Sequence, residues 1–377
     1  MFPVAEYEER LARAQSMMAE RQLDALLLTT EPEIRYFTGY LTRFWESPAR
    51  PWFLIIPAMG KPVAVIPTIG AALMGRTWID DIRTWRSPDY DDDGVGLLAH
   101  TLRDLGASHI ATPMGLETHL RMPLDDFNQL QEMLGETIVS DEGIIPALRM
   151  IKSKAEVAAI RTACDVANRA FARVGEIAGV GVPLSTVFRK FQMLCLDEGA
   201  DWVPYLAGGM GQGGYDDVIS PASDVALQDG DVLMLDTGLV VDGYFCDFDR
   251  NFAIGSITDA TQAAHSKLID AVNSAMAIAK PGATAAELFH AMDDIVTGGA
   301  GGSDTGRLGH GLGMQLTEWP SLIPADGTVL AEGMVLTLEP GIDVGGGKML
   351  VHEENIALTG DGAMFLSDPA PHLMRVL

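Results

Sequence analysis

The chain has 377 residues, of which 47% are hydrophobic, and its 52 acidic and 26 basic side chains give a formal net charge of −26. A chain of this length exceeds the size at which a single core stops growing, so two domains are expected. The negative charge argues against nucleic acid and anionic membranes as partners, because both reward the opposite sign. We expect the charge to form a solubility surface or, alternatively, to attract a cationic metal or substrate.

Nothing in the sequence indicates export or membrane insertion. No apolar run approaches the roughly 20 residues that cross a bilayer, and the acidic N-terminus lacks the basic-then-apolar order of a signal peptide. Three cysteines, Cys164, Cys195 and Cys246, follow neither a zinc-binding nor a disulfide pattern. We therefore expect a soluble, cytoplasmic protein whose thiols are free and buried.

The first part of the chain alternates helical and strand patterns. Apolar residues recur at helical spacing over 6–22, and a short apolar run at 23–30 indicates a buried strand. An aromatic-rich loop follows, and then a hairpin that turns at Met59 and Gly60. Residues 1–150 are predicted to form one α/β domain.

The character of the sequence changes near residue 150. An amphipathic pattern over 149–174 predicts a long helix, with Ser153 as its N-cap and Glu156 three positions later. We place the domain boundary there, so the second domain spans 151–377. Its further helices are predicted at 184–198, 259–280 and 283–297.

The most informative segment is 232–255, in which two strand-like runs flank Asp242 and Gly243. An Asp-Gly pair in this position is a strong hairpin signal. Asp236 and Asp247 lie eleven residues apart and nearly equidistant from the turn. They are therefore expected to face each other on one side of the sheet. Adjacent carboxylates repel unless one takes up a proton or a cation binds both.

A second hairpin is predicted at 335–359, turning at a run of three glycines centred on Gly346. Glu339 and Glu353 are equidistant from that glycine. Between the two hairpins stands His310, within the sequence GHGLG. Four carboxylates with one imidazole suit Mn²⁺, Fe²⁺, Co²⁺ or Zn²⁺ in a two-metal site better than Ca²⁺.

The set resembles the catalytic half of the creatinase/aminopeptidase P/prolidase (peptidase M24) superfamily. The motifs that carry the resemblance are LDTG, CDFDR, GHGLG, LEPGI and HEEN, in that order, together with the N-terminal segment and the connector LRMIKSKAEVAAIRTA. The resemblance implies an α/β (α+β) protein with an N-terminal creatinase-like domain and a C-terminal pita-bread domain, and it implies a homodimer. The metal ligands that it implies are Asp236, Asp247, His310, Glu339 and Glu353.

The resemblance also implies a mechanism. Asp247 and Glu353 would bridge two divalent ions, with Mn²⁺ favoured and Co²⁺, Zn²⁺ or Fe²⁺ as alternatives. Such a pair of cations lowers the pKa of a shared water and polarises an amide carbonyl. Glu339 would accept the proton of that water while binding metal, so Glu339 and His310 are the predicted catalytic residues.

Three positions depart from the family pattern. Thr317 stands where peptidases of this family carry a substrate-contacting histidine, Ile219 where they carry a proton-handling histidine, and Val351 where they carry an arginine. An intact ligand set with an altered pocket predicts a hydrolase that acts on an amide bond of a small peptide or amino-acid derivative, Xaa-Pro peptidase-like but with changed substrate choice. Two alternatives remain open: a metal-dependent lyase resembling dimethylsulfoniopropionate lyases, and a non-enzymatic binding module.

Aromatic and polar residues near the glycine-rich loops are candidates for contacting the substrate, although residues of these kinds often have only structural roles. They are Tyr205, Tyr215, Asp217, Thr317, Glu318, Trp319 and, in the first domain, Trp45. His352, the neighbour of Glu353, is expected on the opposite face of its strand and in a structural role.

Overall fold

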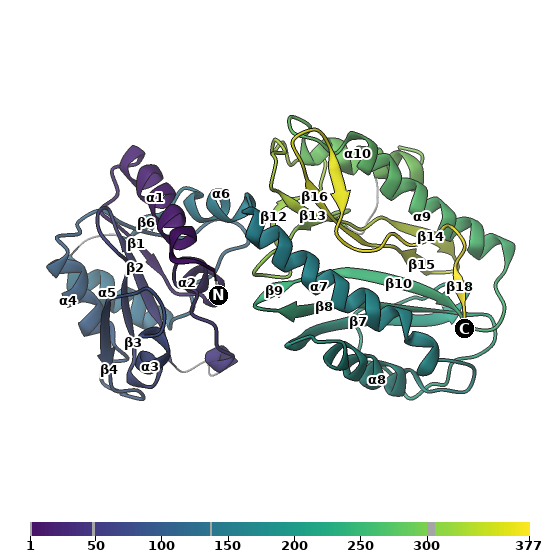
Figure 1. Ribbon diagram of the computed structural model, residues 1–377, viewed down its shortest axis with the longest axis horizontal. Coiled ribbons are helices and arrows are strands. Elements are labelled where there is room, and N and C mark those ends of the chain that lie inside the picture. Colours follow the sequence, from purple (N-terminus) through teal and green to yellow (C-terminus); the bar gives the residue numbers. More distant parts are fainter. Residues whose placement is uncertain (1, 47–49, 136–137, 300–305) are drawn as a thin grey trace. The chain divides into compact units, whose positions relative to one another are not determined.

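The computed structural model describes residues 2–46, 50–135, 138–299 and 306–377. The chain divides into two compact units, Met1–Arg149 and Met150–Leu377 (Figure 1). Among the described residues, no helix is both long enough and apolar enough to span a membrane.

The first unit is built on one six-stranded sheet with the strand order β4-β3-β2-β1-β5-β6. Its strands are β1 (Ala25–Leu28), β2 (Phe53–Pro57), β3 (Val63–Pro67), β4 (Asp81–Trp85), β5 (Ile110–Thr112) and β6 (Val139–Ser140). Its helices are α1 (Val4–Glu20), α2 (Glu31–Thr38), α3 (Ala71–Met74), α4 (Val95–Asp104), α5 (Leu124–Leu134) and α6 (Ile144–Met150). The strand order matches chain order only in part, because the chain passes from the β1–β4 half to the β5–β6 edge through α4.

The apolar runs of this unit fill its core, as their patterns predict. Strand β1 is buried along its whole length, as expected for a short apolar run in the middle of a sheet. Strands β2 and β3 pair antiparallel across the turn at Met59 and Gly60, so the predicted hairpin is confirmed. Gly60 has a φ of 89°, a value that glycine adopts at little cost.

The second unit holds two larger sheets and a two-stranded ribbon. The first sheet has the order β18-β10-β8-β7, with β9 paired to β8, and the second has the order β12-β11-β13-β16-β17. The strands of the first are β7 (Trp202–Gln212), β8 (Asp231–Val241), β9 (Tyr244–Phe245), β10 (Phe248–Ala253) and β18 (Arg375–Val376). The strands of the second are β11 (His310–Gly311), β12 (Glu318–Ser321), β13 (Val335–Leu338), β16 (Glu354–Leu358) and β17 (Ala363–Phe365), and the ribbon pairs β14 (Gly341–Gly345) with β15 (Lys348–Val351).

Two pairs of helices cover these sheets (Figure 1). Helices α7 (Lys154–Ala172) and α8 (Leu184–Asp197) pack on β8 and β7, while α9 (Asp259–Ile278) and α10 (Ala285–Val296) pack on each other and on the ribbon side. The predicted capping box of α7 is present, because Ser153 accepts a hydrogen bond from the backbone of Glu156, and the Glu156 side chain accepts one from the backbone of Ser153.

The register of the hairpin that contains Asp236 and Asp247 differs from the predicted one. The turn residues Asp242 and Gly243 both have positive φ, 49° and 79°, as a two-residue type I′ turn requires. The pairing is therefore symmetric about the middle of Asp242-Gly243, and Asp236 lies opposite Asp249 rather than opposite Asp247. The prediction that Asp236 and Asp247 face each other directly is wrong by two residues, and Asp247 is a diagonal neighbour on the same face.

The register of the second hairpin is the predicted one. Leu338 pairs with Glu354 at the base of the hairpin, and Gly341 pairs with Val351 in the ribbon. Both pairs are equidistant from Gly346, so the same register places Glu339 opposite Glu353.

Candidate metal centre

Five side chains from both sheets converge in the second unit. Asp236 lies in β8 and His310 in β11, Asp247 and Glu353 immediately precede β10 and β16, and Glu339 immediately follows β13. His310 Nε2 is 3.5 Å from Asp247 Oδ2 and 3.4 Å from Glu339 Oε2. One ligand atom each from Asp247, His310 and Glu353 lie within 4.8 Å of one another, a spacing that a single cation can span.

Burial leaves several of these oxygens without a partner. Asp236, Asp247 and Glu353 are at most 9% exposed. Asp236 Oδ1 and Glu353 Oε1 have no hydrogen-bond partner in the described part of the chain. Buried carboxylate oxygens are costly unless a cation or a donor compensates them. The donor set therefore fits divalent metal ions.

The pKa values of the acids also show that their negative charges are costly in this buried position. Burial, with the charge of Asp249 adding to it, raises the pKa of Asp236 to about 8. Burial likewise raises the pKa of Glu339 to about 7, although Arg307 acts in the opposite direction. Burial and the neighbouring acids raise the pKa values of Asp247 and Glu353 well above the ordinary range. A bound divalent cation would keep these groups ionised near neutral pH.

The surroundings of His310 keep its imidazole neutral. Burial lowers its pKa to about 4, so the imidazole carries no charge near neutral pH. Nδ1 lies 2.8 Å from the carbonyl oxygen of Gly311, which only accepts, so the proton resides on Nδ1. Nε2 is therefore left as a lone-pair donor, and it faces the carboxylates.

The glycines around His310 are required by close packing. A Cβ at Gly311 would lie 2.0 Å from the carbonyl oxygen of Trp319, and a Cβ at Gly309 would lie 2.3 Å from that of Thr337. Gly309 also has a φ of 146°. Only glycine permits these backbones to approach so closely, and the approach fixes β11 between its two neighbouring strands.

Thr317 lies beside a cation that the sequence analysis did not select. Arg307 Nη2 donates a hydrogen bond to Thr317 Oγ1 over 3.3 Å. The positive charge of Arg307 acts to lower the pKa values of Asp247 and Glu339, so the guanidinium lies close to the acidic cluster. The signal that could have found Arg307 is its position three residues before His310.

Glu318 is not placed to contact a substrate, and this prediction needs correction. It is 2% exposed and forms an ion pair of 3.0 Å with buried Lys152. Its second oxygen accepts hydrogen bonds from the backbones of Met314 and Gln315. Glu318 thus shapes the loop that carries Thr317. A partner 166 residues away in sequence could not be inferred from local pattern.

The two candidate tyrosines, Tyr205 and Tyr215, differ in position. Tyr215 is 1% exposed, and its hydroxyl bonds Asn251 and the backbone of Val351, so it belongs to the core and not to a substrate surface. Burial, with the charge of nearby Asp236 adding to it, raises the pKa of the Tyr205 phenol, which places this residue of β7 at the edge of the centre.

The remaining residues that were predicted to contact the substrate are Asp217, Trp319 and Trp45. Asp217 accepts hydrogen bonds from the backbones of Ile219 and Ser220, and the Ile219 side chain is 85% exposed. Trp319 is half-buried at the start of β12, and its role stays a prediction. Trp45 lies in the first unit, 5.3 Å between ring centroids from Trp52, and its role also stays a prediction.

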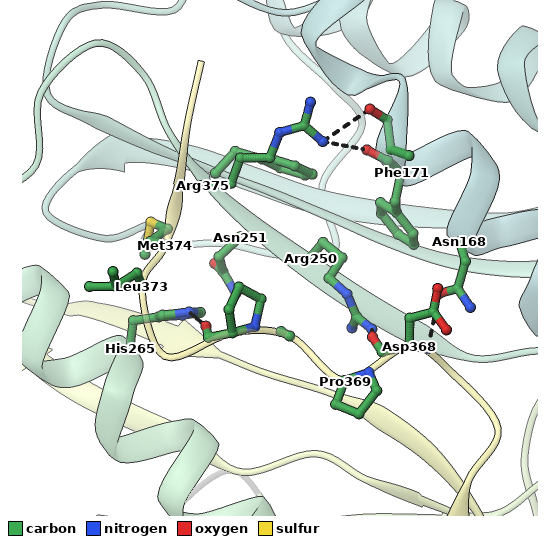
Figure 2. A pocket seen from close by; sticks show the side chains of 14 residues that line it. Asn168, Phe171, Arg250, Asn251, His265, Asp368, Pro369, Leu373, Met374 and Arg375 are labelled. Carbon is green, nitrogen blue, oxygen red and sulfur yellow. Dashed lines mark hydrogen bonds between the residues drawn. The ribbon is translucent and has the colours of Figure 1, made fainter.

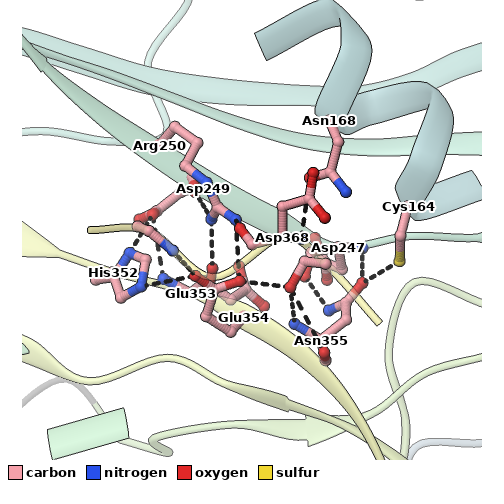
Figure 3. A network of polar contacts seen from close by, with 12 residues as sticks. Cys164, Asn168, Asp247, Asp249, Arg250, His352, Glu353, Glu354, Asn355 and Asp368 are labelled. Atoms are coloured by element: carbon pink, nitrogen blue, oxygen red, sulfur yellow. Dashed lines mark hydrogen bonds and ion pairs between the residues drawn. The ribbon is translucent and has the colours of Figure 1, made fainter. Parts of the chain in front are cut away.

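Behind the acids lies a network of buried polar groups that the sequence analysis largely missed (Figure 3). His352 Nδ1 is 3.2 Å from Asp249 Oδ1, and its Nε2 is 3.1 Å from Glu354 Oε1. Burial lowers the pKa of His352, but the two carboxylates outweigh that effect and raise it. His352 thus has the expected structural role. Counting the register symmetrically about Asp242-Gly243 would have identified Asp249.

A cavity of about 230 Å³ adjoins this network, between α7, β10 and the C-terminal tail (Figure 2). Arg250 links the two, because it lines the cavity and also donates to the carbonyl oxygen of Glu353 and to the carboxylate of Glu354. None of the five converging side chains is among the described residues that line the cavity. We therefore do not assign it to the substrate.

Comparison with known protein families identifies the family to which this chain belongs. Residues 158–360 match metallopeptidase family M24, and residues 10–151 match the creatinase/prolidase N-terminal domain. The first match alone covers more than half of the chain. The chain belongs to metallopeptidase family M24. The predicted family and fold class are confirmed, and members of this family use dinuclear divalent-metal centres.

This M24 chain is similar over its whole length to the probable dipeptidase PepE of Mycobacterium tuberculosis, with 28% identity over 380 residues, covering 100% of this chain and 98% of the relative. The Xaa-Pro dipeptidase of Pyrococcus furiosus is 32% identical over 247 residues, covering 62% of this chain and 67% of the relative. The crystal structure of dipeptidase PepE from Mycobacterium ulcerans covers 100% of this chain and 99% of its own, with a TM-score of 0.85 and 29% identity.

A prolidase structure from Thermococcus sibiricus matches this M24 chain with a TM-score of 0.87 at 22% identity, over 98% of this chain and 99% of its own, a likeness that shows the fold alone. The predicted metallohydrolase is confirmed by the family. These relatives give no support to the lyase alternative.

Proposed function

We propose that the chain is a dinuclear-metal hydrolase of the amide bond in a dipeptide or a small amino-acid derivative. Its metal ligands are Asp236, Asp247, His310, Glu339 and Glu353, and its physiological metal is manganese, with Co²⁺, Zn²⁺ or Fe²⁺ as substitutes. The observation that carries the proposal is the convergence of these five side chains, with buried carboxylate oxygens of Asp236 and Glu353 that have no hydrogen-bond donor in the described part of the chain.

Two bound divalent cations would supply Lewis-acid activation of a water molecule and of the amide carbonyl. Within the chain, Glu339 is the group suited to receive the proton. Its side chain is 25% exposed, whereas those of Asp247 and His310 are at most 5% exposed, so Glu339 is the one that water and substrate can reach. In the metal-free protein, burial raises its pKa to about 7. A carboxylate that water can reach is suited to general-base work.

Arg307 is suited to orient the substrate. An arginine fork matches a carboxylate in two parallel hydrogen bonds, and Thr317 fixes one end of this guanidinium. We assign to Arg307 the recognition of a free carboxylate on the substrate. The names of the similar proteins, dipeptidase and Xaa-Pro dipeptidase, agree with a small substrate of this kind.

We further propose that the chain works as a cytoplasmic homodimer. The three cysteines of the described chain are free and buried, which suits a reducing compartment. The dimer is what the family resemblance implies. Light scattering at micromolar concentration in moderate salt is expected to give the mass of two chains, and the mass of a single chain would contradict this assignment.

The function is tested by metal analysis of the purified protein and by a substrate panel. Two transition-metal ions per chain and complete loss of activity after chelation are expected, whereas full activity of metal-free protein would overturn the proposal. The panel contains Xaa-Pro dipeptides, other dipeptides, acyl amino acids and osmolytes. Because threonine and isoleucine replace the titratable histidines at positions 317 and 219, we expect kcat/KM for Xaa-Pro dipeptides below about 10⁴ M⁻¹ s⁻¹.

A further inference from the structure

The two proposed bridging carboxylates occupy equivalent places in their hairpins. Asp247 immediately precedes β10, and Glu353 immediately precedes β16. These strands belong to different sheets but lie in contact. The relative position of the two carboxylates is therefore not set by backbone pairing within a sheet, and side chains must fix it.

One such side chain is Asp249, two residues after Asp247. Its Oδ1 accepts a hydrogen bond from the backbone N–H of Glu353 over 3.1 Å. His352, the residue before Glu353, holds the same oxygen over 3.2 Å. Asp249 is 1% exposed, so water does not compete for these bonds.

The other side chain is Asn355, two residues after Glu353. Its Oδ1 accepts from the backbone N–H of Asp247 over 2.9 Å, and its Nδ2 donates to the backbone carbonyl of Asp247. Asn355 is fully buried, and the thiol of Cys164 donates to the same Oδ1 over 3.3 Å. The Asn355 carboxamide thus bonds both the N–H and the carbonyl oxygen of Asp247, which leaves the Asp247 backbone little freedom to rotate (Figure 3).

The arrangement is reciprocal, since the residue two positions after each bridging carboxylate holds the backbone of the other. We infer that Asp249 and Asn355 are positioning residues that set the spacing of Asp247 and Glu353 and so decide whether two cations bind together. The inference rests on the proposed function, because it requires those two carboxylates to be shared ligands. Neither residue is one of the five proposed metal ligands.

The physical reason is that two cations near each other repel, and only bridging carboxylates held at the correct separation offset that repulsion. The first cation has ligands enough in Asp247, His310 and Glu353 as they stand. The second cation requires both bridging carboxylates, Asp247 and Glu353, at the correct separation. Loss of a group that orients a ligand typically weakens metal binding by about 10–100-fold.

The test is a Co²⁺ titration of metal-free full-length protein, followed by the visible absorption of the bound ion and by calorimetry. The wild-type chain is expected to bind two ions. Asp249→Ala and Asn355→Ala are expected to keep the first ion and to bind the second about 10–100-fold more weakly, with a changed absorption spectrum. Second-site affinity equal to wild type in both variants would overturn the inference.

Two further variants separate positioning from general stability. Asp249→Asn retains an oxygen for the Glu353 N–H, so it is expected to restore most of the second-site affinity, and failure to do so would contradict a role for this bond. Asp141→Ala removes an equally buried carboxylate, which caps the backbone of Ile145 in the first unit. It is expected to lower the melting temperature and to leave both cobalt affinities unchanged.

Two further outcomes are possible: a variant that does not fold, and a wild-type chain that binds fewer than two ions. If an alanine variant does not fold, Asn355→Ser takes its place, because its shorter side chain cannot hold both backbone groups of Asp247, and wild-type affinity in that variant would again overturn the inference. If the wild-type chain itself binds fewer than two ions, the proposed function fails first, and that result is distinct from two ions bound equally well by wild type and variants.

Discussion

At the scale of single residues, the five proposed ligands are distinguished by their environments and not by their types. Carboxylates of the same chemistry lie at different depths, and Glu339 alone of the four is both raised in pKa and accessible. Its access to water suits Glu339 to exchange a proton during a reaction. The other acids are buried, as suits ligands that remain ionised throughout.

Glu339→Gln is expected to lower kcat by about 10²–10⁴-fold, because an amide oxygen can still contact a metal but cannot accept a proton near neutral pH. Metal content should fall much less than turnover. The measurement is steady-state kinetics alongside metal analysis, with Glu332→Gln as the control, because Glu332 is an exposed glutamate of the same unit. Normal turnover in Glu339→Gln would show that another group takes the proton.

Arg307→Leu is expected to raise KM for a dipeptide about tenfold or more, because a hydrogen bond between charged groups is lost. The corresponding dipeptide amide, which lacks the terminal carboxylate, should be hydrolysed equally by wild type and variant. The comparison of the two substrates therefore serves as its own control for folding and metal content. An equal loss on both substrates would mean that Arg307 acts on the acidic cluster and not on the substrate.

At the scale of elements, the sequence indicated which segments form helices and strands better than it indicated what they contact. The capping box at Ser153, the Met59-Gly60 turn and the glycine-centred hairpin all follow from local chemistry, and the structure contains them. The register at Asp236 was missed because the count placed the turn centre one residue too early. Assigning the positive φ values to Asp242 and Gly243 gives the observed pairing.

The two misplaced candidates and the unpredicted contact of Asn355 have a common cause. Glu318 pairs with Lys152, Tyr215 bonds Val351, and Asn355 grips Asp247, all across more than 100 residues. Spacing within a motif carries no information on such contacts. Local pattern therefore indicated the proposed ligand set as a group, while the residues that contact it from distant parts of the chain became visible only in three dimensions.

The tight turn of the first hairpin permits a test at this scale. Gly243→Ala places a side chain at a φ of 79°, which should cost about 1 kcal/mol of unfolding free energy. Gly327→Ala is the matched control, because its added Cβ meets nothing within 4 Å and its φ is not positive. Urea denaturation of both variants measures the difference. Equal stability of the two variants would show that the turn tolerates a side chain and does not fix the register.

At the scale of the whole molecule, the acidic cluster links stability to pH and to metal. In metal-free protein, Asp236 and Glu339 have pKa values of about 8 and 7, against about 4 in an unfolded chain. Between about pH 4 and pH 8 the folded state holds protons that the unfolded state has released, so the stability of the folded state falls as pH rises. The lowered pKa values of His310 and His265 act oppositely, but only below about pH 6.5.

Metal-free protein is therefore expected to lose at least about 2 kcal/mol of unfolding free energy between pH 6.5 and pH 8, because Asp247 and Glu353 add to the effect of Asp236 and Glu339. Saturating Mn²⁺ should remove this dependence, because the bound ions keep the carboxylates ionised in the folded state. Urea unfolding at three pH values, with and without metal, provides the measurement. A metal-free stability that rises over this interval would contradict the assignment of raised pKa values to the cluster.

The reciprocal hold of Asp249 on Glu353 and of Asn355 on Asp247 also has a consequence for biosynthesis. The two backbone contacts join residues 104 and 108 positions apart, so the first hairpin leaves the ribosome long before its counterpart exists. Contacts of such long range form late, after the local helices and turns. A nascent or truncated chain that ends before residue 355 would present the aspartates without the geometry for two ions, and the pair of ions would be captured together only by a chain whose second unit is complete.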